Sequence, residues 1–493
     1  MSRKALEARA FLLRCRRAYC TTKPAYQELR PATAPRQFPP LTQIRDNVEL
    51  YEQNCLVRNY GSHQDIPQRV ADNVKKMREL DQRMVGSRHA LKELQKQLNT
   101  AQGNKADIVG QMKSIRPEVD ALQAEHDALE LETRNAALSL PNLTFSGTPT
   151  GGEPRLRSYI NYDPDQPPQY SPSADHSIIG EKLGLIDFTS SSMTSGWGFY
   201  FLLHEAALLE QSLVHYALSV AMRRGWSVVS PPSLIYSHMA TACGFQPRDQ
   251  NDEQQIWQIA QPEKDAGKPT RSLAATAEIP LAGIYAGKAI PADRLPVKLV
   301  GSSRCFRAEA GARGVDTKGL YRVHEFTKVE MFAWTDCPAP NSSNGGLTDE
   351  ASWIEHSGQL LAEMVEIQTE ILSSLGLPCR VLEMPTSDLG ASAYRKIDIE
   401  AMFPSRRKKD GGWGEVTSAS ICTDYQSRRL DTRILEADGS RKKFAHTVNG
   451  TAIAIPRVLA ALLENGWRED EGCVVVPPVL RPYMGGFEKI GPR

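Results

Sequence analysis

Two runs of apolar residues at heptad spacing occupy residues 66–138 of the chain. Within each run an apolar side chain returns at every seventh position, and the short polar stretch Gln102-Gly103-Asn104 separates the runs. The heptad positions are Val70, Met77, Met84, Leu91 and Leu98 in the first run, and Ile108, Ile115, Leu122, Leu129 and Ala136 in the second. Two such runs joined by a tight turn predict an antiparallel coiled coil of two helices, which we call the arm.

Beyond the arm, the pattern changes to one of helices mixed with strands. Residues 151–173 are rich in Pro and Gly and predict a linker. Residues 199–222 are apolar at helical spacing and precede a short strand over 226–229. Residues 299–332 predict two strands joined by a long, Gly-rich, charged loop. Long loops inside hairpins usually bind a ligand, and the alternative on this pattern alone is an edge hairpin with a solvated tip.

The overall composition limits the classes of protein to consider. A chain of 493 residues has room for two or more domains, and 41% hydrophobic with 24% charged residues is ordinary for a globular protein. The formal net charge is +1, so binding of a polyanion would depend on local patches. Nine cysteines without a C-x-x-C pair argue against a zinc site or a disulfide scaffold. No apolar run approaches the ~20 residues that span a bilayer.

The hairpin carries a resemblance to a known family. Residues 306–309 (FRAE), a loop, and then residues 322–330 (RVHEFTKVE) resemble motif 2 of class II aminoacyl-tRNA synthetases, in the form found in bacterial and organellar seryl-tRNA synthetases. Three further stretches resemble the same family, namely Thr276 to Glu278, Glu415 to Ser418, and Asn449 to Arg457, the last in the place of motif 3. Overall the resemblance extends from about Phe38 to Gly486.

The resemblance implies an α+β protein with an N-terminal coiled-coil arm and a class II catalytic domain, built as an antiparallel β-sheet flanked by helices. The expected divisions are residues 1–37 as transit peptide and linker, 38–142 as the tRNA-binding domain with the arm, 143–175 as a linker, and 176–493 as the catalytic domain. The helix over 199–222 and the strand after it resemble motif 1, which forms the dimer interface in this family, so a homodimer is expected.

The resemblance also implies an ATP site. Arg307 would grip the α-phosphate with its planar guanidinium, and Arg457 would cover the adenine and hold the γ-phosphate. Glu309 would accept a hydrogen bond from the adenine amino group, and Phe326 would stack on the adenine. Arg322 would reach the phosphate end of ATP. Arg307, Glu309 and Arg457 are therefore the expected catalytic residues, with positioning and charge stabilisation, not a covalent nucleophile, carrying the first step.

A metal ion and an amino acid complete the implied site. Glu415 and Ser418 would supply oxygen ligands to a Mg²⁺ ion that accompanies ATP, because Mg²⁺ takes few protein oxygens together with phosphates and water. Glu278 would bind the ammonium group of L-serine. Recognition of the serine hydroxyl by hydrogen bonds would reject an analogue that lacks it. The residues implied for L-serine are Thr276, Glu278, Arg307, Glu330, Asn449 and Thr451.

Basic residues gather near the turn of the predicted arm, whereas acidic residues lie nearer its base. The basic residues are Lys92, Lys96, Lys105, Lys113 and Arg116. A basic tip on a long lever suits contact with nucleic-acid phosphates, and the alternative is a solvated face of mixed charge. The resemblance favours the first interpretation, since seryl-tRNA synthetases grip the long variable arm of tRNA(Ser) with this domain.

The N-terminus is basic and almost without acidic residues. Seven cations are opposed only by Glu7, and Leu6, Ala10 and Leu13 share one helical face. The cations are Arg3, Lys4, Arg9, Arg14, Arg16, Arg17 and Lys23. This composition predicts a mitochondrial transit peptide and a location in the mitochondrial matrix. The alternative is a disordered basic tail that touches tRNA.

Taken together, these features predict a serine–tRNA ligase. Two positions depart from the family pattern, since Glu325 stands where the family usually has Gln and Pro456 where it commonly has Gly. The alternatives are a non-catalytic paralogue that binds RNA or a partner, a structural coiled-coil protein with an inert globular end, and another class II synthetase. The presence of Arg307, Glu309, Glu415 and Arg457 disfavours the first two, and the pair Glu330 and Thr451 disfavours the third.

Overall fold

The computed structural model describes residues 34–100, 105–168, 175–245, 255–309, 319–337, 354–441 and 443–492. The chain forms two compact units. The first is built from Pro39–Leu56 and Tyr60–Leu140, and the second from Pro35–Phe38, Val57–Asn59 and the chain from Pro141 onward. The predicted transit peptide lies almost entirely outside the described residues. Within the ranges given above, no helix has the length and apolar character required to cross a membrane.

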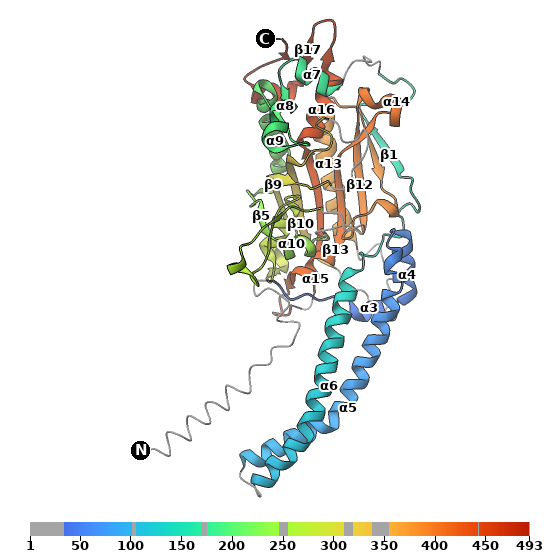
Figure 1. Cartoon of the computed structure of the whole chain (residues 1–493). Coiled ribbons are helices and arrows are strands. Elements are labelled where there is room, and N and C mark those ends of the chain that lie inside the picture. Colours follow the sequence, from blue (N-terminus) through green and yellow to red (C-terminus); the bar gives the residue numbers. More distant parts are fainter. Residues whose placement is uncertain are drawn as a thin grey trace. The chain divides into compact units, whose positions relative to one another are not determined.

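The first unit is helical and contains the predicted arm (Figure 1). Helix α5 (Ile66–Asn99) packs along α6 (Lys105–Ser139), and α3 (Leu41–Asp46), α4 (Val48–Val57) and η1 (Gly61–His63) precede them. The seam between the long helices is formed by apolar residues, of which the buried ones are Val70, Leu80, Met84, Ile108, Met112, Val119 and Leu122. The prediction of a two-helix arm is confirmed, because each apolar stripe is buried against the other helix.

The second unit is organised around an eight-stranded sheet (Figure 1). In spatial order its strands are β1 (Arg155–Ile160), β11 (Cys379–Glu383), β12 (Arg395–Met402), β13 (Trp413–Thr423), β15 (His446–Ala454), β10 (Glu325–Thr335), β9 (Val297–Phe306) and β4 (Ser227–Val228). All neighbouring pairs are antiparallel except β4 with β9. Helices α9 (His204–Arg223), α13 (Glu355–Ser374) and α16 (Ile455–Gly466) pack on the sheet. The expected flanked antiparallel sheet is confirmed.

Shorter elements complete this unit. The helices are α7 (His176–Lys182), α8 (Phe188–Ser195), α10 (Ser237–Ala242), α11 (Glu278–Ala282), α14 (Arg407–Asp410) and α15 (Tyr425–Leu430). The strands are β2 (Ile186–Asp187), β3 (Phe201–Leu202), β5 (Leu234–Tyr236), β6 (Gln258–Ile259), β7 (Arg271–Leu273), β8 (Ala289–Pro291), β14 (Arg433–Leu435), β16 (Trp467–Arg468), β17 (Cys473–Val475) and β18 (Lys489–Ile490).

The two faces of the sheet differ in character, and β10 illustrates the difference. Its side chains alternate between the faces, so Val329, Met331 and Ala333 enter the core that contains the buried sides of α9, α13 and α16. Lys328 and Glu330 lie on the opposite face, where the sheet carries polar side chains. The first face therefore holds the sheet on its helices. The opposite face is polar around Lys328 and Glu330 and becomes apolar further along β10, where Phe332 and Trp334 enter a second core.

One segment of the predicted linker over 143–175 belongs to the β-sheet, which the sequence did not predict. Residues Arg155–Ile160 form β1, which pairs with β11 at the edge of the sheet. Only Ile160 is buried among its six residues. The strand is thus held by backbone hydrogen bonds and gives no apolar alternation in the sequence, which is why the pattern of residues failed to predict it.

A buried arginine supports a loop of the second unit. Arg58 is only 2% exposed. Its Nη1 donates to the carbonyl oxygens of Asn142 at 2.9 Å and Ala393 at 3.0 Å, and its Nη2 donates to the carbonyl oxygens of Leu389 and Gly390. One side chain therefore serves four main-chain acceptors, and its contacts with the Leu389 and Ala393 carbonyl oxygens are buried.

We expect Arg58→Met to lower the free energy of unfolding of the second unit by about 3 kcal/mol or more, because the buried carbonyls lose their donors. Chemical denaturation followed by tryptophan fluorescence measures the change. The matched control is Arg223→Met, which removes a half-exposed guanidinium paired with Glu370 at 2.9 Å and should cost less than about 1 kcal/mol. Equal effects of the two variants would contradict the role assigned to Arg58.

Candidate active site

The polar face of the sheet carries a cavity of about 380 Å³. Its walls come mainly from β10, β12, β13 and β15, from the loops after β9, before β10 and before β12, and from the first residues of α11 and α16. The cavity is lined by every residue that the sequence implied for ATP, Mg²⁺ or serine, namely Thr276, Glu278, Arg307, Glu309, Arg322, Phe326, Glu330, Glu415, Ser418, Asn449, Thr451 and Arg457. The fold thus brings residues 181 positions apart, Thr276 and Arg457, to one site.

Glu278 is a buried carboxyl at one end of this cavity. Its Oε1 accepts hydrogen bonds from Gln426 Nε2 at 2.6 Å and from Asn449 Nδ2 at 3.0 Å. Its own backbone amide donates to Thr276 Oγ1 at 3.2 Å. Burial raises the pKa of Glu278 to about 8, and the neighbouring Glu330 also raises it, against the opposing effects of Lys328, Gln426 and Arg307. A cation that entered here would stabilise the ionised form.

Glu330 and Thr451 meet across two strands because one strand contains an extra residue. Strands β10 and β15 pair Val329 with Ile453 but Glu330 with Thr451, so Ala452 is the extra residue and forms a bulge. Thr451 Oγ1 donates to Glu330 Oε2 at 3.1 Å. Without the bulge, a shift of one residue would turn the threonine to the other face of the sheet.

A second bulge aligns Glu415 and Ser418. Three residues apart on a regular strand, two side chains point to opposite faces. Strands β12 and β13, however, pair Ile399 with Thr417 and Glu400 with Glu415, so Val416 is an extra residue. Both Glu415 and Ser418 consequently line the cavity. The sequence spacing that resembled a metal and phosphate strand becomes usable only through this irregularity.

The carboxylate of Glu415 lies among cations. Arg457 Nη1 is 3.3 Å from Glu415 Oε2 and also donates to the Glu415 carbonyl oxygen at 3.0 Å, while Arg457 Nε donates to the Tyr321 carbonyl oxygen at 3.1 Å. Burial alone would raise the pKa of Glu415, but Arg457, Lys396 and Arg307 hold it below its usual range. The Glu415 carboxyl is therefore anionic at neutral pH.

The residues around Glu415 fit a divalent cation. Asp398 stands opposite Ser418 on the neighbouring strand and is only 3% exposed. Its Oδ2 accepts from Lys396 Nζ at 2.7 Å, whereas its Oδ1 is a buried atom without a hydrogen-bond partner in the described part of the chain. Asp398 does not itself line the cavity, so the oxygens that face the cavity here are those of Glu415 and Ser418, a set that suits Mg²⁺, which prefers oxygen ligands and bound water.

At the remaining end of the cavity, the groups expected to bind nucleotide contact one another. The guanidinium carbon of Arg307 lies 5.2 Å from the centroid of the Phe326 ring. Glu309 Oε2 accepts from Arg322 Nη1 at 3.0 Å. Glu309 also has a φ of 49°, a left-handed conformation that is uncommon for a residue with a side chain and that occurs at functional sites.

Comparison with known proteins gives two family matches and a set of similar chains. Residues 41–144 match the family model described as the seryl-tRNA synthetase N-terminal domain, and residues 262–466 match the tRNA synthetase class II core domain (G, H, P, S and T). A mitochondrial serine–tRNA ligase of Saccharomyces cerevisiae is 37% identical over 89% of this chain and 91% of its own length. The chain belongs to the seryl-tRNA synthetase family.

Other seryl-tRNA synthetases give the same result. The serine–tRNA ligase of Rhodopirellula baltica is 38% identical over 90% of this chain and 97% of its own, and the mitochondrial serine–tRNA ligase of Mus musculus is 41% identical over 76% and 66%. The crystal structure of seryl-tRNA synthetase from Pyrococcus horikoshii complexed with ATP has a TM-score of 0.77 at 28% identity, covering 92% of this chain and 99% of that one. The relatives therefore establish the family, and the solved structure has the same fold.

The two departures from the seryl-tRNA synthetase pattern lie in different surroundings. Glu325 Oε1 accepts from Arg304 Nε at 2.9 Å across β9 and β10, and Glu325 is not among the residues that line the cavity. Pro456 lines the cavity in the first turn of α16. A backbone N–H at this position would have no acceptor within the helix, so a proline here removes no helical hydrogen bond.

Sequence reasoning missed three polar residues of the site. Gln426 donates to Glu278, Lys396 lines the cavity beside Asp398, and Lys328 contacts both Glu330 and Thr451. Lys328 had a usable signal, since it lies two residues before Glu330 on a predicted strand and must share its face. Gln426 and Lys396 had none, because their neighbours in the site depend on how separate elements pack and pair.

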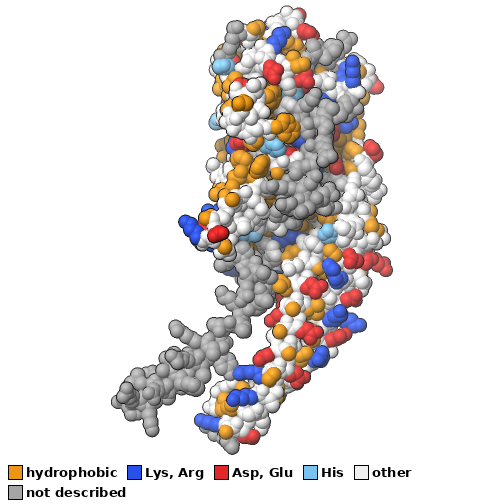
Figure 2. All heavy atoms as spheres, viewed as in Figure 1, with side chains coloured by type: hydrophobic (Ala, Val, Ile, Leu, Met, Phe, Trp, Pro, Cys, Tyr) orange, Lys and Arg blue, Asp and Glu red, His pale blue; other side chains and the backbone are white. Residues whose placement is uncertain are grey.

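The basic residues expected to contact tRNA lie near the turn between α5 and α6. Figure 2 shows Lys and Arg side chains on the surface of these helices. Lys92 and Lys96 come near the end of α5, and Lys105, Lys113 and Arg116 near the start of α6. Because the two helices run antiparallel, both groups fall at the same end, and all five side chains are exposed. The arrangement gives the arm a basic tip.

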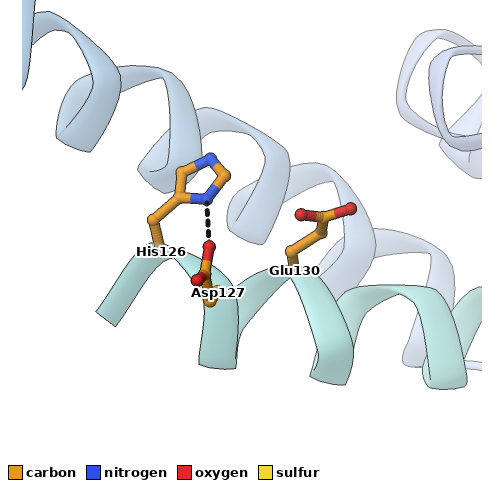
Figure 3. A group of neighbouring side chains, drawn as sticks. All are labelled: His126, Asp127 and Glu130. Atoms are coloured by element: carbon orange, nitrogen blue, oxygen red, sulfur yellow. Dashed lines mark ion pairs between the residues drawn. The ribbon is translucent and has the colours of Figure 1, made fainter. Parts of the chain in front are cut away.

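Another group on α6 has the composition of a metal site. His126, Asp127 and Glu130 lie side by side, with His126 Nδ1 3.7 Å from Asp127 Oδ1 (Figure 3). Both carboxylates already have donors, Gln123 at 2.6 Å for Asp127 and Arg134 at 3.2 Å for Glu130. We therefore assign no metal to this group.

We expect the carboxyl of Glu278 to titrate with a midpoint near pH 8 in the protein without substrates, because burial disfavours its ionised form. The charged groups that face the Glu278 carboxyl are Glu330 and Lys328 on β10 and Arg307 after β9. Burial raises the pKa of the nearby Cys243 and Cys422 thiols, so these thiols stay neutral. Carbon-13 NMR of labelled glutamate carboxyls measures the midpoint, with Glu278→Gln as the control that removes the signal. A midpoint near the ordinary ~4.3 would contradict the prediction.

Proposed function

We propose that this protein activates L-serine with ATP and transfers the serine to the 3′ end of tRNA(Ser) in the mitochondrial matrix. The observation that carries the proposal is that Arg307 and Arg457 line one cavity together with the polar cluster of Glu278, Glu330 and Thr451. Two cationic groups suit a polyphosphate, and the cluster suits an amino acid with a hydroxyl side chain.

In the first step, the serine carboxylate attacks the α-phosphate of ATP in line, pyrophosphate leaves, and seryl-adenylate forms. Arg307 would hold the α-phosphate while negative charge gathers on it, and Arg457 would hold the γ-phosphate. Glu415 and Ser418 would hold Mg²⁺, which supplies charge neutralisation for the leaving pyrophosphate when it is bound. No side chain needs to form a covalent bond, because positioning lowers the barrier.

The amino acid would be bound by its two polar ends. Its ammonium would pair with Glu278, which is positioned by Gln426 and Asn449, and its hydroxyl would lie near Glu330 and Thr451. Because Glu278 is largely protonated below its pKa of about 8, binding of the ammonium releases a proton at neutral pH. Phe326 would stack on the adenine, with Glu309 accepting a hydrogen bond from its amino group and Arg322 near the phosphates.

In the second step, the terminal ribose hydroxyl of the tRNA attacks the activated carbonyl, and AMP leaves. The tRNA would be held by the basic tip of the arm, formed by Lys92, Lys96, Lys105, Lys113 and Arg116. The location in mitochondria is supported by the basic N-terminus and by relatives whose names include that location. We also propose a homodimer, as the motif 1 resemblance implies.

We expect Arg307→Ala to reduce serine-dependent exchange of pyrophosphate into ATP by at least about 100- to 1000-fold, the usual effect of removing one group that stabilises transition-state charge. The matched control is Arg304→Ala on the preceding strand β9, whose guanidinium binds Glu325 and Thr327 and does not line the cavity. Exchange that stays near normal in Arg307→Ala would refute the role of this arginine.

We expect combined substitution of Lys92, Lys96, Lys105 and Lys113 by Ala to weaken charging of tRNA(Ser) and to leave pyrophosphate exchange unchanged, since the tip would touch only the tRNA. The slope of log affinity against log salt should become less steep by about 0.9 for each phosphate that the tip no longer neutralises. The control replaces the exposed Lys75 and Lys76 near the other end of α5. If the tip variant charges tRNA as well as the unaltered protein, the arm does not act through its tip.

A further inference from the structure

A lysine that the mechanism above does not use lies inside the subsite proposed for the serine side chain. Lys328 is 5% exposed and lines the cavity from β10. Its Nζ forms an ion pair with Glu330 Oε2 and donates to Thr451 Oγ1 at 3.1 Å. Thr451 Oγ1 in turn donates to Glu330 Oε2 at 3.1 Å. The three side chains therefore form a closed triangle of polar contacts.

This triangle fixes which atoms remain available to a ligand. A threonine hydroxyl has one proton and two lone pairs. The proton of Thr451 is used on Glu330, and one lone pair receives Lys328, which leaves the other lone pair for a ligand. Glu330 uses Oε2 for both partners, so its Oε1 is available to accept. Both groups therefore offer acceptors, and the ligand that suits them donates a hydrogen bond.

Lys328 keeps Glu330 and Thr451 in this arrangement of hydrogen-bond acceptors. A carboxylate as buried as Glu330, at 2% exposed, is costly without a cation beside it. With an uncharged residue at position 328, the Glu330 carboxylate would lose its ion pair, and Thr451 Oγ1 would lose the donor that occupies one of its lone pairs. The threonine hydroxyl would also be free to rotate. The subsite would then lose its preference for a donating side chain.

The charges in the pocket are consistent with this role. This end of the cavity contains two carboxyls, Glu278 and Glu330, and Lys328 forms its ion pair with Glu330. Glu278 is thus left for the ammonium of an amino acid, and Glu330 is reserved for side-chain recognition. If Lys328 served only to hold β10 and β15 together, its loss would weaken the fold without changing the choice of substrate.

We propose that Lys328 is a positioning residue that sets the hydrogen-bond polarity of the side-chain subsite, and that it thereby contributes to the selection of a hydroxylated amino acid over one without a hydroxyl. The proposal rests on the proposed function, since it concerns the amino acid bound at that same site. It assigns Lys328 no contact with ATP.

The test is pyrophosphate exchange with L-serine, L-alanine and L-cysteine as substrates of Lys328→Met, Lys328→Gln and Lys328→Arg. For Lys328→Met and Lys328→Gln we expect the KM for serine to rise and the serine-to-alanine ratio of kcat/KM to fall by about 10- to 100-fold, the effect of losing a buried hydrogen bond to a charged group. The serine-to-cysteine ratio should fall as well, because a thiol is a weaker donor than a hydroxyl. In these two variants the KM for ATP should change by less than about twofold. Lys328→Arg keeps the positive charge and should restore most of the discrimination between serine and alanine.

The control is Lys298→Met on the adjacent strand β9. Lys298 is partly buried, with its side chain 21% exposed, and binds Glu363 at 2.9 Å, but it does not line the cavity. Its loss should lower the melting temperature and leave the serine-to-alanine ratio unchanged. If Lys328→Met does not fold, Lys328→Gln carries the same prediction, and ATP affinity reports whether each variant has an intact cavity.

The possible outcomes separate the proposed function from the proposed role of Lys328. Absence of serine-dependent exchange in the unaltered protein would contradict the proposed function. Normal exchange in the unaltered protein, with a serine-to-alanine ratio that stays the same in folded Lys328→Met or Lys328→Gln, would overturn the role of Lys328 alone. A lower ratio that Lys328→Arg fails to restore would also overturn it, because the effect would then follow the shape of the side chain and not its charge.

Discussion

Pairing of charged side chains on one face of the β-sheet is the constraint on which the site depends. Glu330 is paired with Lys328, and Glu415 with Arg457. The side chains of Lys328 and Glu330 are almost fully buried, so an isolated charge there would be costly, whereas the Glu415 side chain is 41% exposed and its pair with Arg457 is only partly buried. The opposite face makes this possible, because its apolar side chains pack on α9, α13 and α16 and hold the strands in place.

Two bulges convert this face from a regular ladder into a site. A regular strand offers alternate residues to one face, which limits the combinations of side chains that can meet. The extra residues Ala452 and Val416 shift the register by one position each. As a result Thr451 faces Glu330, and Glu415 lies on the same side as Ser418. Bulges next to active sites commonly reorient side chains in this way.

Groups proposed to bind ATP bind one another across the cavity. Arg307 rests over Phe326, Arg322 pairs with Glu309, and Arg457 pairs with Glu415. ATP would replace contacts of this kind with similar ones to phosphate and adenine, so these charged groups would have partners both before and after binding. Such an exchange would limit the rearrangement that binding requires.

The sequence by itself determined the elements whose pattern is local. Heptads predicted the helices of the arm because each helix presents its own apolar stripe, and the strands of the hairpin followed from apolar runs on both sides of a charged loop. The family motifs named the side chains of the site. Edge strand β1 escaped prediction because five of its six residues are not buried, and backbone pairing holds it in the sheet.

Only the tertiary structure decided that Glu415 and Ser418 share a face, that Gln426 supports Glu278, and that Lys328 closes a triangle with Glu330 and Thr451. The physical reason is that sequence spacing reports the periodicity within one element, whereas these contacts depend on the register between strands and on the packing of elements that lie far apart in the chain.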